Sequence, residues 1–341
     1  MRHAGLLIAV ALGATLAVPI LLGGNDALWQ TLHFPADGYL AIFAVIVTSW
    51  LARAIKLHLL LHQLKVRPRF TRTLAISLAT DFAFISTPGG VGGYAASVYY
   101  LRRAGTSVSG AATITAADQG LDLLFFTLAL PLSGLALIWS DLPETLALLG
   151  FASSALMIGL ALGALLARRK LAAWLFGANK IGARWPRLQR KQQALREFLV
   201  SLHANGRLLL AGGPTFLCGI FALTALQWLT RYGVLWLVLV LLGHRVSFAL
   251  TLLLQSLVLH AALWTGVPAG GGSAELGLSA TLAAWVPATS IATALLLWRI
   301  GTLYLCLAAG AVAMAVLAHR SRLQSIQLHI AQALPAEESV N

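Results

Sequence analysis

Six apolar runs, each about twenty residues long or longer, constrain this chain more than any other feature of its sequence. A helix needs about 20 apolar residues to cross a bilayer. Only 10% of the 341 residues are charged, whereas soluble domains have about 25%. The sequence therefore predicts an all-α polytopic membrane protein, one membrane domain over residues 1–341. It excludes a soluble enzyme, a disordered chain and a disulfide scaffold. The expected spans are roughly 4–24 (too long for a typical signal peptide), 38–62, 107–140, 144–167, 208–242 and 286–318.

The basic residues gather in particular connections between these runs. Lys and Arg number 24 against 11 Asp and Glu. Of the 24, 21 fall before the first run, between 53 and 72, at 102–103, between 168 and 207, or after the last run. The connections 25–37 and 141–143 contain aspartates but no Lys or Arg. Because cytoplasmic loops are rich in Lys and Arg, we expect a bacterial inner (cytoplasmic) membrane protein with both termini cytoplasmic.

The segment 168–207 contains ten of the basic residues together with Trp174 and Trp185. It is expected to be a basic cytoplasmic linker that lies on anionic lipid headgroups; a site for a soluble partner is the weaker alternative. An excess of positive charge would suggest nucleic acid in a soluble protein. In a membrane protein the positive-inside rule accounts for it, so no nucleic-acid partner is expected.

Two further apolar stretches, about 72–101 and 248–285, are interrupted by proline and glycine. The first contains Pro88-Gly-Gly-Val-Gly-Gly and the second Pro268-Ala-Gly-Gly-Gly. Basic residues flank the first stretch at both ends, and its arms are too short to cross the bilayer twice. We therefore expect two opposed re-entrant hairpins, the first from the cytoplasmic side and the second from the other side. Their turns must be surrounded by protein or water.

The two stretches match one another at an offset of 180 residues, or 178 further upstream. Because the loop charges orient the halves oppositely, we interpret the match as an inverted repeat with halves of about 38–140 and 208–318. Transporters of this plan have their sites near the midplane, and a helix that begins after each turn would direct free N–H groups at an anion. Tight packing of small residues is the alternative. The matched pairs are Pro88 and Pro268, Gly90 and Gly270, Gly92 and Gly272, Gln119 and Arg299, Trp50 and Trp228, and Arg53 and Arg231.

Several ionisable residues lie inside the apolar segments, where a functional role is the default interpretation. Glu275 follows the second turn and is expected to cap the next helix or to pair with Arg299. The planar fork of Arg299 also suits a lipid phosphate. Asp118 and Asp122 are four residues apart and share a helix face. They would bind a cationic group, carry protons, or be wetted near the cytoplasmic end. The other members of this set are Asp81 and Arg231.

Common catalytic motifs are absent from the sequence. It has no H-E-x-x-H, no G-x-x-x-x-G-K-[ST] and no Cys-x-x-Cys, so we expect neither an enzyme nor a cofactor or metal. A membrane-embedded enzyme that uses Ser273 and His260 is the weakest alternative.

At these residues the chain resembles the membrane domain of lysylphosphatidylglycerol synthases (the flippase half of the multiple peptide resistance factor) and its stand-alone relatives. The resemblance covers about residues 40–318. It is carried by both Pro-Gly motifs, by Asp118-Gln-Gly-Leu-Asp122, and by Glu275 with Arg299. It implies a lipid-translocating membrane domain with two opposed re-entrant hairpins.

The chain departs from the usual pattern of that family mainly in its first half. Tyr94, Ser97 and Gln119 stand where the family usually has glutamate, arginine and arginine, and Ala274 replaces an arginine in the second half. Glu275 and Arg299 are retained. The first half thus lacks charges that would bind a headgroup, which implies a different substrate or an asymmetric site.

Together these features predict transbilayer movement, as by a flippase or scramblase, of a phospholipid or polyprenyl-linked lipid. Its headgroup would pass through a polar groove between the hairpins. Membrane lipid is the expected partner, and a homo-oligomer is possible. An ion-coupled small-solute transporter on the same plan is the alternative. The expected substrate-binding residues are Arg299, Glu275, Gly90, Gly92, Gly270, Gly272, Tyr94, Gln119, Asp118 and Asp122.

Overall fold

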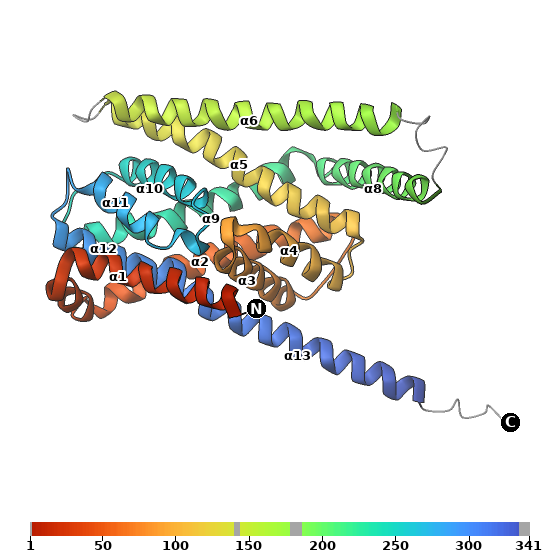
Figure 1. Cartoon of the computed structure of the whole chain (residues 1–341), viewed down its shortest axis with the longest axis horizontal. Helices are drawn as coiled ribbons and strands as arrows, with labels where there is room; N and C mark the ends of the chain where they lie inside the picture. The colour runs from red at the N-terminus through yellow and green to blue at the C-terminus, as the bar shows by residue number, and fades with distance from the viewer. Residues whose placement is uncertain (1, 140–143, 178–185, 334–341) are drawn as a thin grey trace.

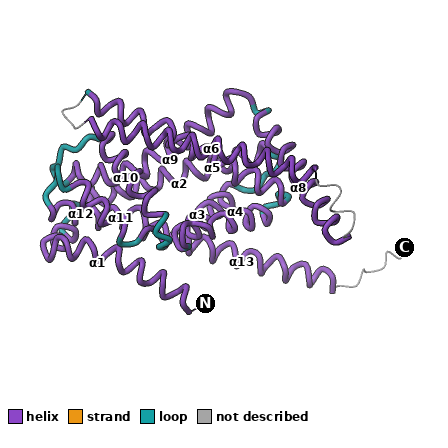
Figure 2. Tube along the Cα trace, turned by 45° about the horizontal axis from the view of Figure 1, so that its top comes forward, coloured by secondary structure: helices purple, strands orange, loops and turns teal. Residues whose placement is uncertain are grey.

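The computed structural model describes residues 2–139, 144–177 and 186–333, and over these ranges the chain consists of helices and short turns, with no strand (Figures 1 and 2). Six helical stretches within the described residues are long and apolar enough to cross a membrane, as predicted. They lie in α1 (Arg2–Leu32), α2 (Ala36–Gln63), α5 (Val108–Ile138), α6 (Glu144–Gly177), α9 (Gly213–Leu241), and α12 (Ala288–Arg299) with α13 (Leu305–Ala333).

The last span is continuous through a π-helical turn, Ile300–Tyr304, which joins α12 to α13. Figure 1 shows α6 along the outer edge of the molecule beside α5, and α13 extending beyond the helical bundle. The N-terminal helix α1 bends at Gly24, whose backbone is in a positive-φ conformation (φ 58°).

The two interrupted stretches fold as pairs of short helices, each joined through a 3₁₀ turn. The first comprises α3 (Phe70–Ser86), the turn η1 (Pro88–Gly90) and α4 (Val91–Arg103). The second comprises α10 (Phe248–Leu263), the turn η2 (Pro268–Gly270) and α11 (Ser273–Leu282). In both pairs the two helices pack against each other, and η1 contacts η2. The breaks predicted at the two prolines are therefore confirmed, since proline cannot continue the helical hydrogen-bond ladder.

The basic segment 168–207 is largely helical. α6 continues to Gly177, and α8 (Pro186–Leu210) follows and packs against α5. Residues 178–185, including Trp185, and the side chain of Trp174 lie outside the described part of the chain. The contact of this segment with anionic lipid stays a prediction.

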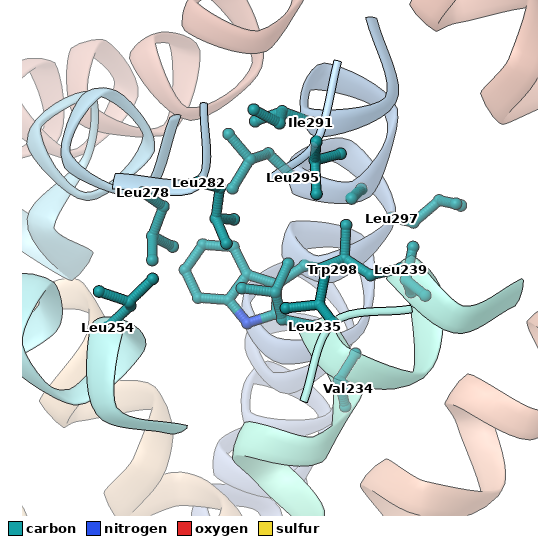
Figure 3. Close-up of a cluster of buried hydrophobic side chains, with 14 of the residues drawn as sticks. Val234, Leu235, Leu239, Leu254, Leu278, Leu282, Ile291, Leu295, Leu297 and Trp298 are labelled. Atoms are coloured by element: carbon teal, nitrogen blue, oxygen red, sulfur yellow. The ribbon is translucent and has the colours of Figure 1, made fainter. Parts of the chain in front are cut away.

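Each interrupted stretch packs on its own apolar core. In one core, side chains of α9 to α12 surround the buried Trp298, including Leu235, Leu254 and Leu278 (Figure 3). A second core joins α3, α4 and α5 to α2 and α13.

Candidate functional site

Six ionisable side chains from four helices form the largest charged cluster among the described residues of the helical bundle. Three are cationic and three acidic, so their charges sum to zero when all are ionised. We call this set the six-charge cluster. Its members are Arg53 and Lys56 on α2, Asp81 on α3, Asp118 and Asp122 on α5, and Arg231 on α9.

Asp81 lies between the two arginines that the sequence repeat matches. Arg53 Nη1 contacts Asp81 Oδ1, and Arg231 Nη1 lies 3.5 Å from Asp81 Oδ2. The other Arg53 terminal nitrogen, Nη2, lies 3.4 Å from Asp118 Oδ2. The two halves of the chain therefore converge on one carboxylate.

Lys56 holds the two carboxylates of α5. Its Nζ lies 2.6 Å from Asp118 Oδ1 and 3.4 Å from Asp122 Oδ1. The indole N–H of Trp228 on α9 also donates to Asp122 Oδ1 at 2.8 Å. The cationic group that these aspartates bind is thus part of the chain itself.

Burial differs among the six side chains. Lys56 is fully buried and Asp81 is 5% exposed, whereas the other four are 11–18% exposed. A buried ion without a partner is destabilising by about 3–5 kcal/mol. Loss of one member would therefore leave a charge without its partner, and four of the six side chains keep a partly exposed edge.

Arg53 and Lys56 were counted with the basic residues of the cytoplasmic side, and that side stays a prediction. Both lie within α2, three residues apart on one face, and are paired with carboxylates from α3 and α5. Counting basic residues near the end of a span does not show whether they pair with carboxylates on neighbouring helices. The predicted orientation now rests on the other 19 of the 21.

A separate ion pair lies beside the second turn. Arg299 Nε donates to Glu275 Oε1, and Glu275 Oε2 accepts from the backbone N–H of Gly272 at 2.8 Å. Both expected roles of Glu275 are confirmed, because the carboxylate caps α11 and pairs with the arginine. Glu275 is 0% and Arg299 4% exposed.

The rest of the Arg299 guanidinium is held within the protein. Nη1 donates to the Ala269 carbonyl at 3.4 Å, and the group lies over the Trp298 ring, 4.4 Å from its centre. Nη2 has no hydrogen-bond partner among the described residues. Ala269 has positive φ (55°), a conformation that L-residues rarely adopt.

The helix α1 covers this second turn. A Cβ added at Gly271 would lie 2.4 Å from the Ala11 carbonyl oxygen, and one added at Gly272 would lie 3.4 Å from the Ala14 Cβ. The backbones of α1 and the turn can approach this closely because the turn has glycine there. The ion pair is therefore enclosed.

The first turn carries neutral polar groups instead. Gly89 and Gly90 have positive φ, and the Thr87 hydroxyl accepts from the Gly92 N–H at 2.9 Å. Tyr94 Oη donates to Gln119 Oε1 at 3.2 Å, so two of the predicted site residues are in contact. The Tyr94 side chain is 44% exposed.

The predicted site residues thus fall into four groups. Gly90, Gly92, Gly270 and Gly272 shape the two contacting turns, Tyr94 joins Gln119, and Glu275 joins Arg299. Asp118 and Asp122 belong to the six-charge cluster. The sequence reasoning missed Arg53 and Lys56 as site residues and did not place Trp228 beside them. A basic pair three residues apart, opposite an acidic pair four residues apart, was the signal that could have found them.

Ser273 and His260 each bond to a backbone carbonyl of their own stretch. The Ser273 hydroxyl donates to the Gly270 carbonyl at 3.0 Å, and His260 Nδ1 lies 2.7 Å from the Ser256 carbonyl oxygen. Among the described residues, no group of three or more His, Cys, Asp or Glu is placed to hold a metal ion.

These features define a polytopic α-helical membrane protein with a charged cluster between its helices and two contacting Pro-Gly turns. The family described as "Lysylphosphatidylglycerol synthase TM region" matches residues 4–310, and the chain belongs to this family. It is also similar to a "UPF0104 membrane protein" of Archaeoglobus fulgidus. The two are 24% identical over 286 residues, which cover 79% of this chain and 83% of that relative.

Proposed function

We propose that this protein moves a lipid between the two leaflets of a bacterial inner membrane, as a flippase or scramblase does. The substrate would be a phospholipid or a polyprenyl-linked lipid. Its headgroup would pass the first turn and the exposed edge of the six-charge cluster, while its chains stay in the bilayer. The observation that carries the proposal is that four of the six charges remain 11–18% exposed inside apolar helices. The family is described as the membrane region of a lipid synthase, which supports a lipid as the substrate.

We also propose that the two interrupted stretches are re-entrant hairpins of an inverted repeat. α4 has 13 residues and α11 has 10. At about 1.5 Å per residue neither can cross a hydrocarbon core of about 30 Å. In each half, the helix that follows the turn bonds to the next long helix. The bonded residues are 25 apart in the first half and 24 apart in the second. Both termini would then be cytoplasmic.

The proposed hairpins can be tested by labelling single cysteines from one side of the membrane, after Cys218→Ser and Cys306→Ala. A re-entrant first stretch requires that Arg69→Cys and Arg102→Cys react from the same side. A re-entrant second stretch requires that Arg245→Cys and Ala284→Cys both react from the other side. A stretch whose two ends react from opposite sides crosses the membrane, and the proposal would then fail.

The Glu275–Arg299 pair would have a different role from the six-charge cluster and the first turn. The Glu275–Arg299 pair is enclosed by α1 and already neutralised, so we assign it to holding the second turn. The unpartnered Nη2 of Arg299 is the group through which the alternative, contact with a headgroup phosphate, would act.

The activity can be tested by reconstituting the full chain in liposomes that contain fluorescent phospholipids, then bleaching the outer leaflet chemically. Wild type should make lipid of the inner leaflet bleachable, and Lys56→Met should abolish this by disrupting the cluster. Tyr99→Phe is the matched control, because its hydroxyl, within the described part of the chain, bonds to Arg103 on α4 and not to the six-charge cluster. If wild type moves no lipid above empty liposomes across several headgroups, the proposed function is wrong.

A second candidate, an ion-coupled small-solute transporter, is favoured by one specific observation. Asp118 and Asp122 share a single buried lysine, an arrangement in which one carboxylate could exchange a proton. This candidate predicts proton flux into dye-loaded liposomes that Asp122→Asn abolishes, with lipid movement absent. Lipid movement without proton flux would exclude it.

A further inference from the structure

Two hydrogen-bonded pairs of neutral polar side chains join α4, the helix that follows the first turn, to α5. Tyr94 bonds to Gln119, as described above. Toward the start of α5, the Ser97 and Thr115 hydroxyls share a hydrogen bond of 2.8 Å. We call these four residues the neutral patch. None of them carries a charge at neutral pH.

The neutral patch keeps unused hydrogen-bonding capacity. Within the described residues, the Gln119 side chain makes a single hydrogen bond, through Oε1, which leaves its NH₂ group free to donate. The Tyr94 hydroxyl donates that bond and can still accept another. The Gln119 NH₂ group can therefore donate to a hydroxyl of a ligand, and the Tyr94 hydroxyl can accept from one.

The aromatic ring of Tyr94 is also presented for contact. It packs edge-on against Phe84, with ring centres 4.9 Å apart, and yet 44% of the side chain is exposed. A ring held in this way offers an apolar face beside a polar tip. Such a combination suits a sugar or polyol, which presents C–H groups on one face and hydroxyls at its edge.

The charges nearest to the patch are already paired. Gln119 directly follows Asp118, whose carboxylate contacts Lys56 and Arg53. A charged headgroup could gain a partner here only by breaking one of these ion pairs. The side chain that lost its partner would then be a buried, unpaired charge, which is destabilising. A neutral polyhydroxylated headgroup requires no such exchange.

Beside the second turn, the helix that follows also bonds to the next helix, but through a different kind of pair. There the bonded pair is Glu275 and Arg299, which is ionic and enclosed. Of the two pairs, the neutral one is open.

We propose that the neutral patch selects lipids whose terminal headgroup is an uncharged sugar or polyol. This inference rests on the proposed function for its place in transport, but the recognition itself can be measured as binding. The full chain would be placed in nanodiscs and titrated with two short-chain diacylglycerol lipids. One would carry glucose and the other phosphoserine, and binding would be followed by native mass spectrometry.

We expect the glucosyl lipid to bind about 10-fold more tightly than the phosphoserine lipid. Tyr94→Phe should weaken glucosyl-lipid binding about 3- to 10-fold, the effect of one lost hydrogen bond. Gln119→Glu should remove the preference, while Tyr99→Phe on the same helix should leave it unchanged.

Equal binding of the two lipids, or a preference that survives both patch variants, would overturn the inference. The corresponding fluorescent lipids would then be compared in the liposome assay. If the preference holds in binding but no lipid moves, recognition stands and the proposed transport fails. If lipid moves without any such preference, transport stands and the inference fails.

Discussion

The two Pro-Gly turns have similar backbones but different surroundings. Each begins with a proline, contains residues at positive φ, and is followed by a helix that bonds to the next long helix. At the second turn this bond is a buried ion pair covered by α1; at the first it is a neutral, partly exposed hydrogen bond. The comparison teaches that two similar turns can be surrounded differently, one by a buried ion pair under α1 and the other by a neutral, partly exposed pair.

The largest effect should come from breaking the enclosed ion pair. Glu275→Gln leaves the Arg299 charge buried without its counter-charge, which should lower the free energy of unfolding by about 3–5 kcal/mol. The double variant Glu275→Gln with Arg299→Met should recover most of that loss. Tryptophan fluorescence during denaturation in mixed micelles would measure it. If Glu275→Gln alone is as stable as wild type, the ion pair is not needed for stability.

A smaller loss is expected in the six-charge cluster, because its edge is partly exposed. Lys56→Met should lower the free energy of unfolding by about 2–3 kcal/mol, since Asp118 keeps Arg53 and Asp122 keeps the Trp228 N–H. The same denaturation measurement applies. If Lys56→Met costs more than Glu275→Gln, the cluster rather than the second turn is the main structural support.

One alanine substitution in each turn sharpens the contrast further. Gly271→Ala would place a Cβ 2.4 Å from the Ala11 carbonyl oxygen and should cost about 1–3 kcal/mol as α1 is pushed away. Gly89→Ala meets no atom closer than 4.0 Å, so its cost of about 1 kcal/mol comes from positive φ alone. The thiol introduced by Ala14→Cys should react faster when it is combined with Gly271→Ala, but not when it is combined with Gly89→Ala. Equal reactivity in both variants would mean that α1 does not cover the second turn.

The smallest effect on stability should come from the open pair. Tyr94→Phe removes a partly exposed hydrogen bond and should change the free energy of unfolding by about 0.5 kcal/mol or less. Its effect should instead be seen in the rate of lipid movement. If Tyr94→Phe lowers the free energy of unfolding as much as Glu275→Gln does, Tyr94 mainly stabilises the fold.

The sequence predicted the spans and the positions of the breaks well, because hydropathy and proline act locally. It also identified Glu275 with Arg299, since two opposite charges in apolar segments need partners. Lys56 was missed because its neighbours in sequence place it at a span end, while its partners come from α5, more than 60 residues away. Likewise, nothing in the sequence around Ala11 shows that α1 covers the second turn. That contact depends on how the helices pack.

The most direct test of the central claim is the rate of lipid movement, per folded protein, of two variants in the same liposomes. The account predicts that Gln119→Leu, which opens the neutral pair, slows movement about 10-fold while stability stays near that of wild type. The folded double variant Glu275→Gln with Arg299→Met should move lipid within about threefold of the wild-type rate. The opposite result, a normal rate for Gln119→Leu and loss of movement in the double variant, would place the headgroup at Arg299 and contradict the account.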